Sequence, residues 1–356
     1  MYIYVLTLLL STFSSYVLKR NRRNIFNYKL FFYFTLLMLI ISPTIRSSIV
    51  GTDSGNYVGS FYKLKELNDF WFNNTTSYEL GYQLLERIAN ILASDYWALF
   101  FIISLIVNYF YLRTIVYLSE NISMSLFLFI TLGTYFFFFN GARQGIAAAI
   151  YSYSLIYLIK GDFKKYLFWV LIASFFHKTV LITIPFYFIF RLKFSYKNLF
   201  IIISVSIVIV FFSSYLLFLF PDTFAKRFTV YQDRKSSGAI LLTVFYVLIT
   251  LFFVFIRKYI PQEKNKIYDI YLNMTILTAI IYLFVSLSGQ DVNLIRLTLY
   301  FSLSYILIWP IIFKYIKFMH NTFFKFTFYI IHFVFFIIFI HKMSNLLPYK
   351  INPYFL

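Results

Sequence analysis

Apolar runs long enough to cross a lipid bilayer recur from residue 2 to residue 341, and this recurrence constrains the fold more than any other feature. Hydrophobic residues make up 61% of the 356 positions, more than one soluble core can hold. A helix needs about 20 mostly apolar residues to span the ~30 Å of hydrocarbon in a bilayer. We therefore expect an all-α, polytopic membrane protein. Because no Pro-, Gly- or Ser-rich linker divides the chain, residues 1–356 are expected to form a single transmembrane domain.

The hydropathy pattern predicts about ten full spans. The segment 163–192 is ambiguous, because His177 and Lys178 interrupt it. It either crosses once or forms a hairpin of two short antiparallel helices that meet at these two residues. The ten expected spans are residues 2–18, 29–45, 96–118, 123–140, 141–159, 199–220, 239–256, 268–288, 292–313 and 323–341.

Charge decides between the two arrangements. Lysine and arginine number 32 against 13 carboxylates, an excess that is also seen in nucleic-acid-binding proteins. Here the basic residues gather in short loops between apolar runs, which is the positive-inside pattern, so the lipid bilayer is an expected partner and nucleic acid is not. The densest basic segment, 19–29, places that loop in the cytoplasm. Only the hairpin returns the basic segments 191–197, 257–266 and 314–325 to the cytoplasm, and we favour it.

The residue types present exclude several kinds of chemistry. The chain has no cysteine, so it has no disulfide, no thiolate nucleophile and no cysteine-ligated metal. Its histidines lie far apart, without the spacing of metal ligands, at positions 177, 320, 332 and 341. We expect neither a bound metal nor a cofactor.

The longest polar stretch, residues 46–95, holds six of the thirteen carboxylates and is expected on the outer side of the membrane. Within it, residues 78–93 alternate as an amphipathic helix that lies along the membrane surface or across the mouth of a cavity. Glu79, at the positive end of the helix dipole, is a candidate functional residue. Glu86 is expected on a solvated face. The apolar stripe is Leu80, Leu84, Ile88, Ile91 and Leu92, and the polar stripe is Glu79, Gln83, Glu86 and Asn90.

Two arginines stand near the predicted outer ends of apolar helices. Arg143 opens the small-residue segment GARQGIAAA, and Arg296 lies about one turn after Asp291, a candidate N-cap. A cation in the first turn opposes the helix dipole, which makes sense if an anion binds there. A phosphate or diphosphate clamp fits this pattern. The alternative is that the arginines anchor at lipid headgroups or pair with Asp53 or Asp291.

His177 and Lys178 form an ionisable pair inside the apolar stretch SFFHKTVLI. Such residues are costly in a membrane segment and indicate a functional site, although a lone histidine is also a common structural donor. The hairpin would bring this pair to the same outer side as Asp53, Glu79 and Arg143. Arg113, near the inner end of its helix, is expected to be an interfacial anchor.

Several motifs resemble those of the EpsG family of membrane proteins, which overlaps the Wzy-type polymerases of O-antigen and exopolysaccharide. They are GTDSGNYVGSFY (51–62), YELGY (78–82), NGARQGIAAAI (140–150), ASFFHKTVLITIPFY (173–187) and VNLIRLTLYF (292–301). The resemblance implies a glycosyltransferase-C-like helical fold in the bacterial inner membrane. It also implies that repeat units carried on undecaprenyl diphosphate are joined at the periplasmic face. The positions that carry over are Asp53, Glu79, Arg143, His177, Arg296 and Tyr300.

Residues and resemblance lead to one mechanism. Departure of a diphosphate requires cations at the developing charge, for which Arg143, Arg296 and Lys178 are the candidates. The acceptor hydroxyl requires a general base, and His177, Glu79 and Asp53 all stay open for that role. Tyr57, Tyr82 and Tyr300, which lie in the motifs, are expected to contact sugar.

The expected partners are an undecaprenyl-diphosphate-linked oligosaccharide and, in some systems, a co-polymerase that regulates chain length. Two other functions stay open: a flippase for lipid-linked oligosaccharides, and a glycosyltransferase that adds one sugar from a polyprenyl-phosphate donor. Against transport, the polar residues gather at one surface rather than at the membrane midplane, and no repeat relates the two halves of the chain.

The charge pattern gives a test of topology. A reporter fused after Lys197 should report cytoplasm, and one fused after Gly238 should report periplasm. The reverse pair of results would rule out the hairpin at His177 and the placement of the polar residues on one side.

Overall fold

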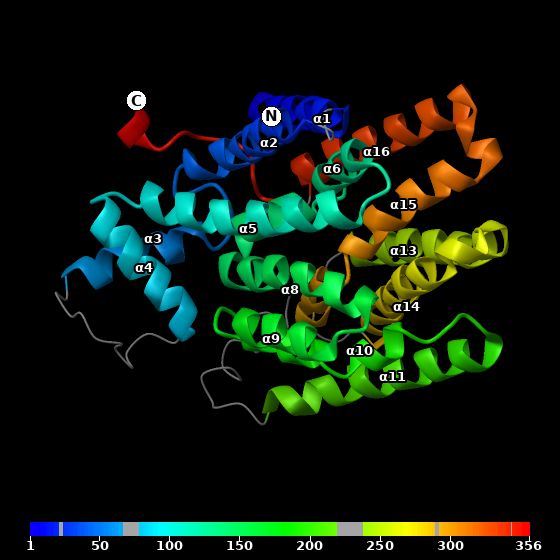
Figure 1. The fold of residues 1–356 in the computed structure, drawn as a ribbon. Coiled ribbons are helices and arrows are strands. Elements are labelled where there is room, and N and C mark those ends of the chain that lie inside the picture. The colour runs from blue at the N-terminus through cyan, green and yellow to red at the C-terminus, as the bar shows by residue number, and fades with distance from the viewer. Residues whose placement is uncertain (21–23, 67–77, 219–237, 289–291, 343) are drawn as a thin grey trace. The chain divides into compact units, whose positions relative to one another are not determined.

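The computed structural model describes residues 1–356 except 21–23, 67–77, 219–237, 289–291 and 343 (Figure 1). Throughout these described residues the regular elements are helices. The extended backbone contributes one isolated antiparallel bridge, between Arg46 and Ile351. The all-α prediction is confirmed.

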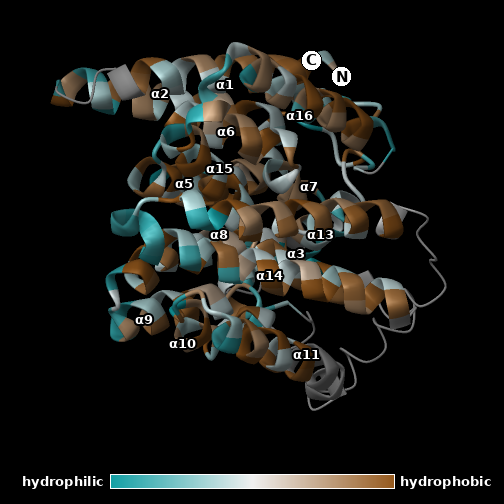
Figure 2. Ribbon diagram, turned by 90° about the vertical axis from the view of Figure 1, so that its right-hand side faces the viewer, coloured by the Kyte–Doolittle hydropathy of each residue, from teal (hydrophilic) through white to brown (hydrophobic). Residues whose placement is uncertain are grey.

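Five described helices are long and apolar enough to cross a bilayer. Two bent helix pairs would raise the number to seven if each forms one span. Figure 2 shows hydrophobic residues along most of the helical ribbon and hydrophilic residues at several helix ends and loops. The chain is therefore a multi-pass membrane protein, while the number of about ten spans stays a prediction. The five helices are α2 (Ile25–Thr44), α5 (Trp97–Leu118), α13 (Gly238–Ile256), α14 (Asn265–Ser288) and α16 (Thr322–Lys342).

Two of the predicted spans are not continuous helices. In the range 123–140, α6 (Ile122–Thr131) ends two residues before Gly133, whose φ of +80° cannot continue a helix. The chain resumes as η1 (Thr134–Phe136) and α7 (Phe137–Asn140), bent by 59° from α6. In the range 292–313, η5 (Val292–Tyr300) and α15 (Leu303–Tyr315) are bent by 47°.

Contacts divide the chain into two compact units. Unit 1 comprises residues 1–181 and 321–356. In it, α1 (Tyr2–Arg20) packs on α2 and α6, α2 packs on α5, and α16 packs on α6. The helix α5 also contacts α8 (Ala142–Lys160), which packs on α9 (Phe163–Ser174) (Figure 1). These helix contacts hold in place two helix ends that carry residues of the candidate site: the start of α8 and the end of α9.

The predicted interruption at His177 and Lys178 is present. The helix α9 ends at Ser174, and the chain continues as η2 (Lys178–Thr183) and α10 (Phe186–Phe190). The residues predicted to form the second arm of the hairpin are thus a 3-10 segment and a short helix rather than one continuous helix, and the hairpin itself stays a prediction.

The C-terminal segment, residues 344–356, packs against the end of α2. The Ser47 amide donates to the Lys350 carbonyl (2.8 Å), and the Asn352 amide donates to the Ile45 carbonyl (2.8 Å). The Asn352 side chain also donates to Asp95 (2.7 Å). These bonds fix the backbone on both sides of Arg46, where the polar 46–95 segment begins.

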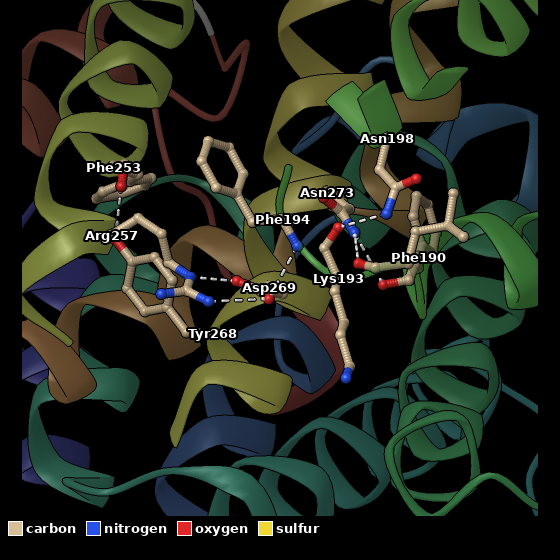
Figure 3. A network of polar contacts seen from close by, with 10 residues as sticks. Phe190, Lys193, Phe194, Asn198, Phe253, Arg257, Tyr268, Asp269 and Asn273 are labelled. Atoms are coloured by element: carbon tan, nitrogen blue, oxygen red, sulfur yellow. Dashed lines mark hydrogen bonds and ion pairs between the residues drawn. The ribbon is translucent and has the colours of Figure 1, made fainter. Parts of the chain in front are cut away.

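Unit 2 comprises residues 182–320 and is arranged around α14. The helices α10, α11 (Tyr196–Phe218), α13 and α15 all pack on it. Asp269 on α14 accepts two hydrogen bonds from the Arg257 guanidinium and one from the Phe194 amide (3.0 Å), as Figure 3 shows. One buried carboxylate thereby joins η3 (Arg257–Tyr259), which follows α13, to α14 and to the loop before α11.

The Arg257–Asp269 pair predicts a large loss of stability in Asp269→Asn. Asp269 is 3% exposed and the Arg257 side chain is 15% exposed, so removing the carboxylate leaves a mostly buried cation without a counter-charge. We expect the free energy of unfolding to fall by about 3–5 kcal/mol, measured by thermal unfolding of the purified protein in detergent.

Asp162→Asn is the matched control, since Asp162 forms an exposed pair with Lys165 and caps α9. Asparagine keeps the cap, so its melting temperature should stay near that of the wild type. Equal losses in both variants would contradict the role given to the buried pair.

Candidate functional site

The predicted amphipathic helix is present as α4 (Leu80–Leu92), with the polar stripe turned inward. Its apolar stripe is uncovered: Leu80 is 53% exposed and Ile91 is 74% exposed. On the polar side, Glu79 and Gln83 are buried and Glu86 is 0% exposed. The prediction that Glu86 lies on a solvated face is therefore wrong. A helix at a membrane surface presents its apolar side to lipid, which leaves its polar side to pack against protein.

Close backbone contact brings the start of α4 to the end of α9. The Gly81 amide donates to the Phe175 carbonyl (2.9 Å). A Cβ atom at position 81 would lie 2.7 Å from that oxygen, closer than side chains allow. Glycine at this position lets Glu79 approach His177.

A second close contact positions Arg143 in the first turn of α8. A Cβ atom at Gly145 would lie 2.5 Å from the Cβ of Phe138, so α7 and α8 pack tightly only because residue 145 is glycine. This is the close packing that the small residues of GARQGIAAA predict. The Ala142 amide, also in the first turn, donates to the Tyr57 hydroxyl (3.1 Å).

Glu79 lies between a guanidinium and an imidazole. Its Oε2 accepts from Nη1 of Arg143 (2.5 Å), and its Oε1 lies 3.0 Å from Nδ1 of His177. The side chain of Glu79 is 6% exposed, and those of Arg143 and His177 are 14% and 15% exposed. The structure thus joins three of the predicted site residues in one cluster, and Arg143 pairs with Glu79 rather than with Asp53.

The cluster sets the charge of Glu79. Burial by itself raises the pKa of the carboxyl, but the hydrogen bond from His177 and the charge of Arg143 outweigh it and lower the pKa to about 2. Glu79 is ionised at neutral pH and is a very weak base. Its geometry suits it to orient the two groups it contacts.

Tyrosines surround the cluster. The Tyr78 ring lies 4.6 Å from Cζ of Arg143, and Tyr82 contacts both Tyr78 and Tyr57 at ring-centroid distances of 5.3 and 5.4 Å. Burial raises the pKa of Tyr57 to about 12, so it is a neutral phenol. Tyr57 is 5% exposed and Tyr82 is 0% exposed, whereas Tyr78 is half-buried. Tyr78, which sequence reasoning did not single out, is the tyrosine of this group closest to the surface.

The other predicted residues of unit 1 lie at the margin of the cluster. Asp53 is half-buried in the turn before α3 (Ser54–Glu66), and its charge acts on Tyr57. Lys178 is exposed and follows His177 directly. The backbone amide of Thr52 donates to Oδ1 of Asn140 (2.9 Å). The side-chain Nδ2 of Asn140 donates to the Ser344 carbonyl (2.9 Å). Asn140 thereby links the turn at Asp53, the start of α8 and the C-terminal segment.

Arg296 and Tyr300 belong to unit 2. Arg296 is exposed and Tyr300 is buried, and both lie in the 3-10 segment η5. The expected N-cap, Asp291, lies outside the described residues. Arg296 is not in the first turn of a long α-helix as predicted, because the α-helix of this region, α15, begins at Leu303. A joint clamp of Arg143 and Arg296 stays a prediction.

Sequence reasoning missed Arg46. Its guanidinium lies between the rings of Phe100 and Phe139, 4.3 Å from each centroid, and the residue is 1% exposed. Burial lowers its pKa to about 10, which still leaves it charged at neutral pH. Its Nε and Nη1 have no hydrogen-bond partner among the described residues. The sequence offered one signal for this residue: it is a single arginine between an apolar run and the GTD motif at residues 51–53.

Among the described side chains, no three histidines and carboxylates are arranged to hold a metal ion.

A model of the EpsG family matches residues 29–351, nearly the whole chain. The chain belongs to this family, which is associated with Wzy-type polymerases, and the resemblance seen in the motifs is confirmed. The family supports a membrane protein of the polysaccharide-polymerase type. Neither the curated proteins nor the solved structures compared with the chain gave a match.

The lowered pKa of Glu79 predicts an acid-dependent loss of stability. Folding favours the ionised form of Glu79. Its contribution to the free energy of unfolding is therefore complete above the ordinary glutamate pKa of ~4.3 and is lost as pH falls toward 2. We expect this contribution to be on the order of 3 kcal/mol. Unfolding of the detergent-solubilised protein at pH 6, 4 and 2.5 measures it.

Glu79→Gln should be less stable than the wild type at pH 6 and should approach it at pH 2.5. Glu263→Gln, which removes an exposed carboxylate, serves as the control and should run parallel to the wild type. A Glu79→Gln curve that also runs parallel would show that the carboxylate gains nothing from Arg143 and His177.

Proposed function

We propose that this EpsG-family protein is a polysaccharide polymerase. It joins oligosaccharide repeat units carried on undecaprenyl diphosphate, at the periplasmic face of the bacterial inner membrane. Family membership supports the class of activity. The cluster of Glu79, Arg143 and His177 supports the chemistry.

One observation carries the proposal: Arg143 is held by Glu79 through only one edge of its guanidinium. Nη1 donates to Glu79, whereas Nε is buried and has no acceptor among the described residues. A planar guanidinium held in this way presents its Nε–Nη2 edge in a fixed direction, and that edge matches two oxygens of a phosphate group. The geometry supports a diphosphate at Arg143, with Glu79 as the residue that orients the arginine.

His177 is the group we assign as general base. With a proton on Nδ1 donated to Glu79, the imidazole carries its lone pair on Nε2, which can accept the proton of a hydroxyl group. Glu79 and Asp53 are the other candidates for the general base. The low pKa of Glu79 argues against Glu79 in that role.

The proposed step is a direct displacement. The acceptor hydroxyl gives its proton to Nε2 of His177, and its oxygen bonds to the anomeric carbon of the donor sugar. The bond from that carbon to the diphosphate oxygen breaks, and undecaprenyl diphosphate leaves with the electron pair. Arg143 stabilises the charge that develops on the leaving group. Lys178, exposed beside His177, and Arg296 are further cations that we assign to the diphosphate. We assign sugar contact to Tyr57, Tyr82 and Tyr300.

The test is complementation of a deletion strain, with the length of surface polysaccharide as the readout. Arg143→Lys should lose polymer because an ammonium cannot bond Glu79 and two phosphate oxygens through one rigid plane. His177→Gln should lose polymer because it has no base. In reconstituted protein each variant should turn over at least ~100-fold more slowly. Single-repeat products should accumulate in both strains.

Arg113→Lys is the matched control, since Arg113 is an exposed arginine on α5. It should give polymer of normal length. Normal polymer from Arg143→Lys or from His177→Gln, at normal protein level, would remove that residue from the mechanism. Complete absence of surface product in the deletion strain, including single repeats, would favour a flippase over a polymerase.

A further inference from the structure

A second group of polar side chains lies between α3 and α4, apart from the Glu79 cluster. Both carboxylate oxygens of Glu86 are buried and have no hydrogen-bond partner among the described residues. The same holds for the hydroxyls of Tyr82 and Ser60 and for Oδ1 of Asn90. Buried polar atoms in folded proteins nearly always have a hydrogen-bond partner. Four neighbouring residues that each keep a buried oxygen without one therefore require an explanation.

These residues form one cluster. Tyr82, Glu86 and Asn90 are spaced by four positions, which places them on one side of α4. The Asn90 amide donates to the carbonyls of Glu86 (3.1 Å) and of Phe61 on α3 (3.2 Å). Ser60 precedes Phe61, and its hydroxyl faces the Glu86 carboxylate without reaching hydrogen-bond geometry.

Neighbouring polar groups on the same helix show the contrast. Gln83 donates to the Tyr78 carbonyl (2.6 Å), and Glu79 bonds Arg143 and His177. Glu79 and Gln83 therefore have partners, whereas Tyr82, Glu86 and Asn90 each keep a buried oxygen without a partner among the described residues. Oxygen and hydroxyl groups arranged in this way match a ligand that offers several hydroxyls.

The charge state of Glu86 suits such a ligand. Burial raises the pKa of its carboxyl to about 7, although the nearby Ser60 hydroxyl and the charges of Arg143 and Arg87 act in the opposite direction. Near neutral pH the carboxyl can therefore donate one hydrogen bond as well as accept others. Glu79, two turns earlier at the start of the same helix, is an anion at neutral pH.

We propose that Ser60, Tyr82, Glu86 and Asn90 form a second binding site, which takes the hydroxyl groups of a carbohydrate. Resting on the proposed function, we assign this carbohydrate as the acceptor chain, held ~10 Å along α4 from Glu79.

The first experiment labels carboxyl groups in the purified full-length protein with dicyclohexylcarbodiimide, which reacts with protonated carboxyls in apolar surroundings. At pH 7 the label should appear on Glu86 and not on Glu79, as read by mass spectrometry of peptides from residues 78–93. Oligosaccharide released by mild acid from the host strain's own polysaccharide should slow labelling at least threefold. Labelling of Glu86 at an unchanged rate would overturn the carbohydrate site.

The second experiment separates binding from turnover. Glu86→Gln keeps the shape of the protonated side chain, and Ser60→Ala removes one hydroxyl from α3. In reconstituted protein, both should raise the KM for acceptor at least tenfold while kcat changes less than threefold. Asn108→Leu on α5, which removes a buried amide whose Oδ1 also has no partner among the described residues, should change neither. An unchanged KM for acceptor in Ser60→Ala would overturn the assignment of this site to the acceptor. This holds whether or not Glu86→Gln folds.

The two proposals fail in different ways. If the wild-type protein makes no polymer from a lipid-diphosphate repeat unit but oligosaccharide still protects Glu86, the polymerase proposal fails and the carbohydrate site stands. If polymer forms normally without protection, the site between α3 and α4 fails and the polymerase stands.

Discussion

The Glu79 carboxylate, held between Arg143 and His177, is the interaction on which the candidate site depends. It joins three segments that are far apart in the sequence: the start of α4, the first turn of α8 and the end of α9. A carboxylate that is 6% exposed needs compensating charge, and each of its two oxygens meets one donor. The close backbone contacts at Gly81 and Gly145 serve this arrangement, because larger residues would push the three segments apart.

Much of the site could be predicted because polar residues are rare in this chain. His177 was selected because it interrupts an apolar stretch, and Glu79 and Arg143 because each stands at the start of a predicted helix. Their pairing could not be read from the sequence, since it depends on how distant helix ends meet. The environment of Glu86 was predicted wrongly for a different reason. An amphipathic pattern defines two faces of a helix, but it does not say which face meets protein when lipid is also available as a solvent.

The helices themselves followed from hydropathy, whereas their interruptions did not. Apolar composition is the same on both sides of Gly133, so the range 123–140 looks like one span although the backbone turns there. The same is true of η5 and α15, and it changes the setting of Arg296 from a helix N-terminus to a 3-10 segment. Arg46 was missed because a single arginine at the end of an apolar run is normally an interfacial anchor, and only tertiary packing buries it between two rings.

The C-terminal segment has a consequence for the order in which the protein matures. Residues 45 and 47 are translated early, yet the backbone groups that bond them belong to Lys350 and Asn352. The side-chain amide of Asn140, the last residue of α7, likewise finds its carbonyl acceptor at Ser344. The backbone around Arg46 must therefore wait for these bonds until α16 and the residues after it have been synthesised. A chain stalled within α16 would thus contain every residue of the Glu79 cluster without the bonds that fix its surroundings.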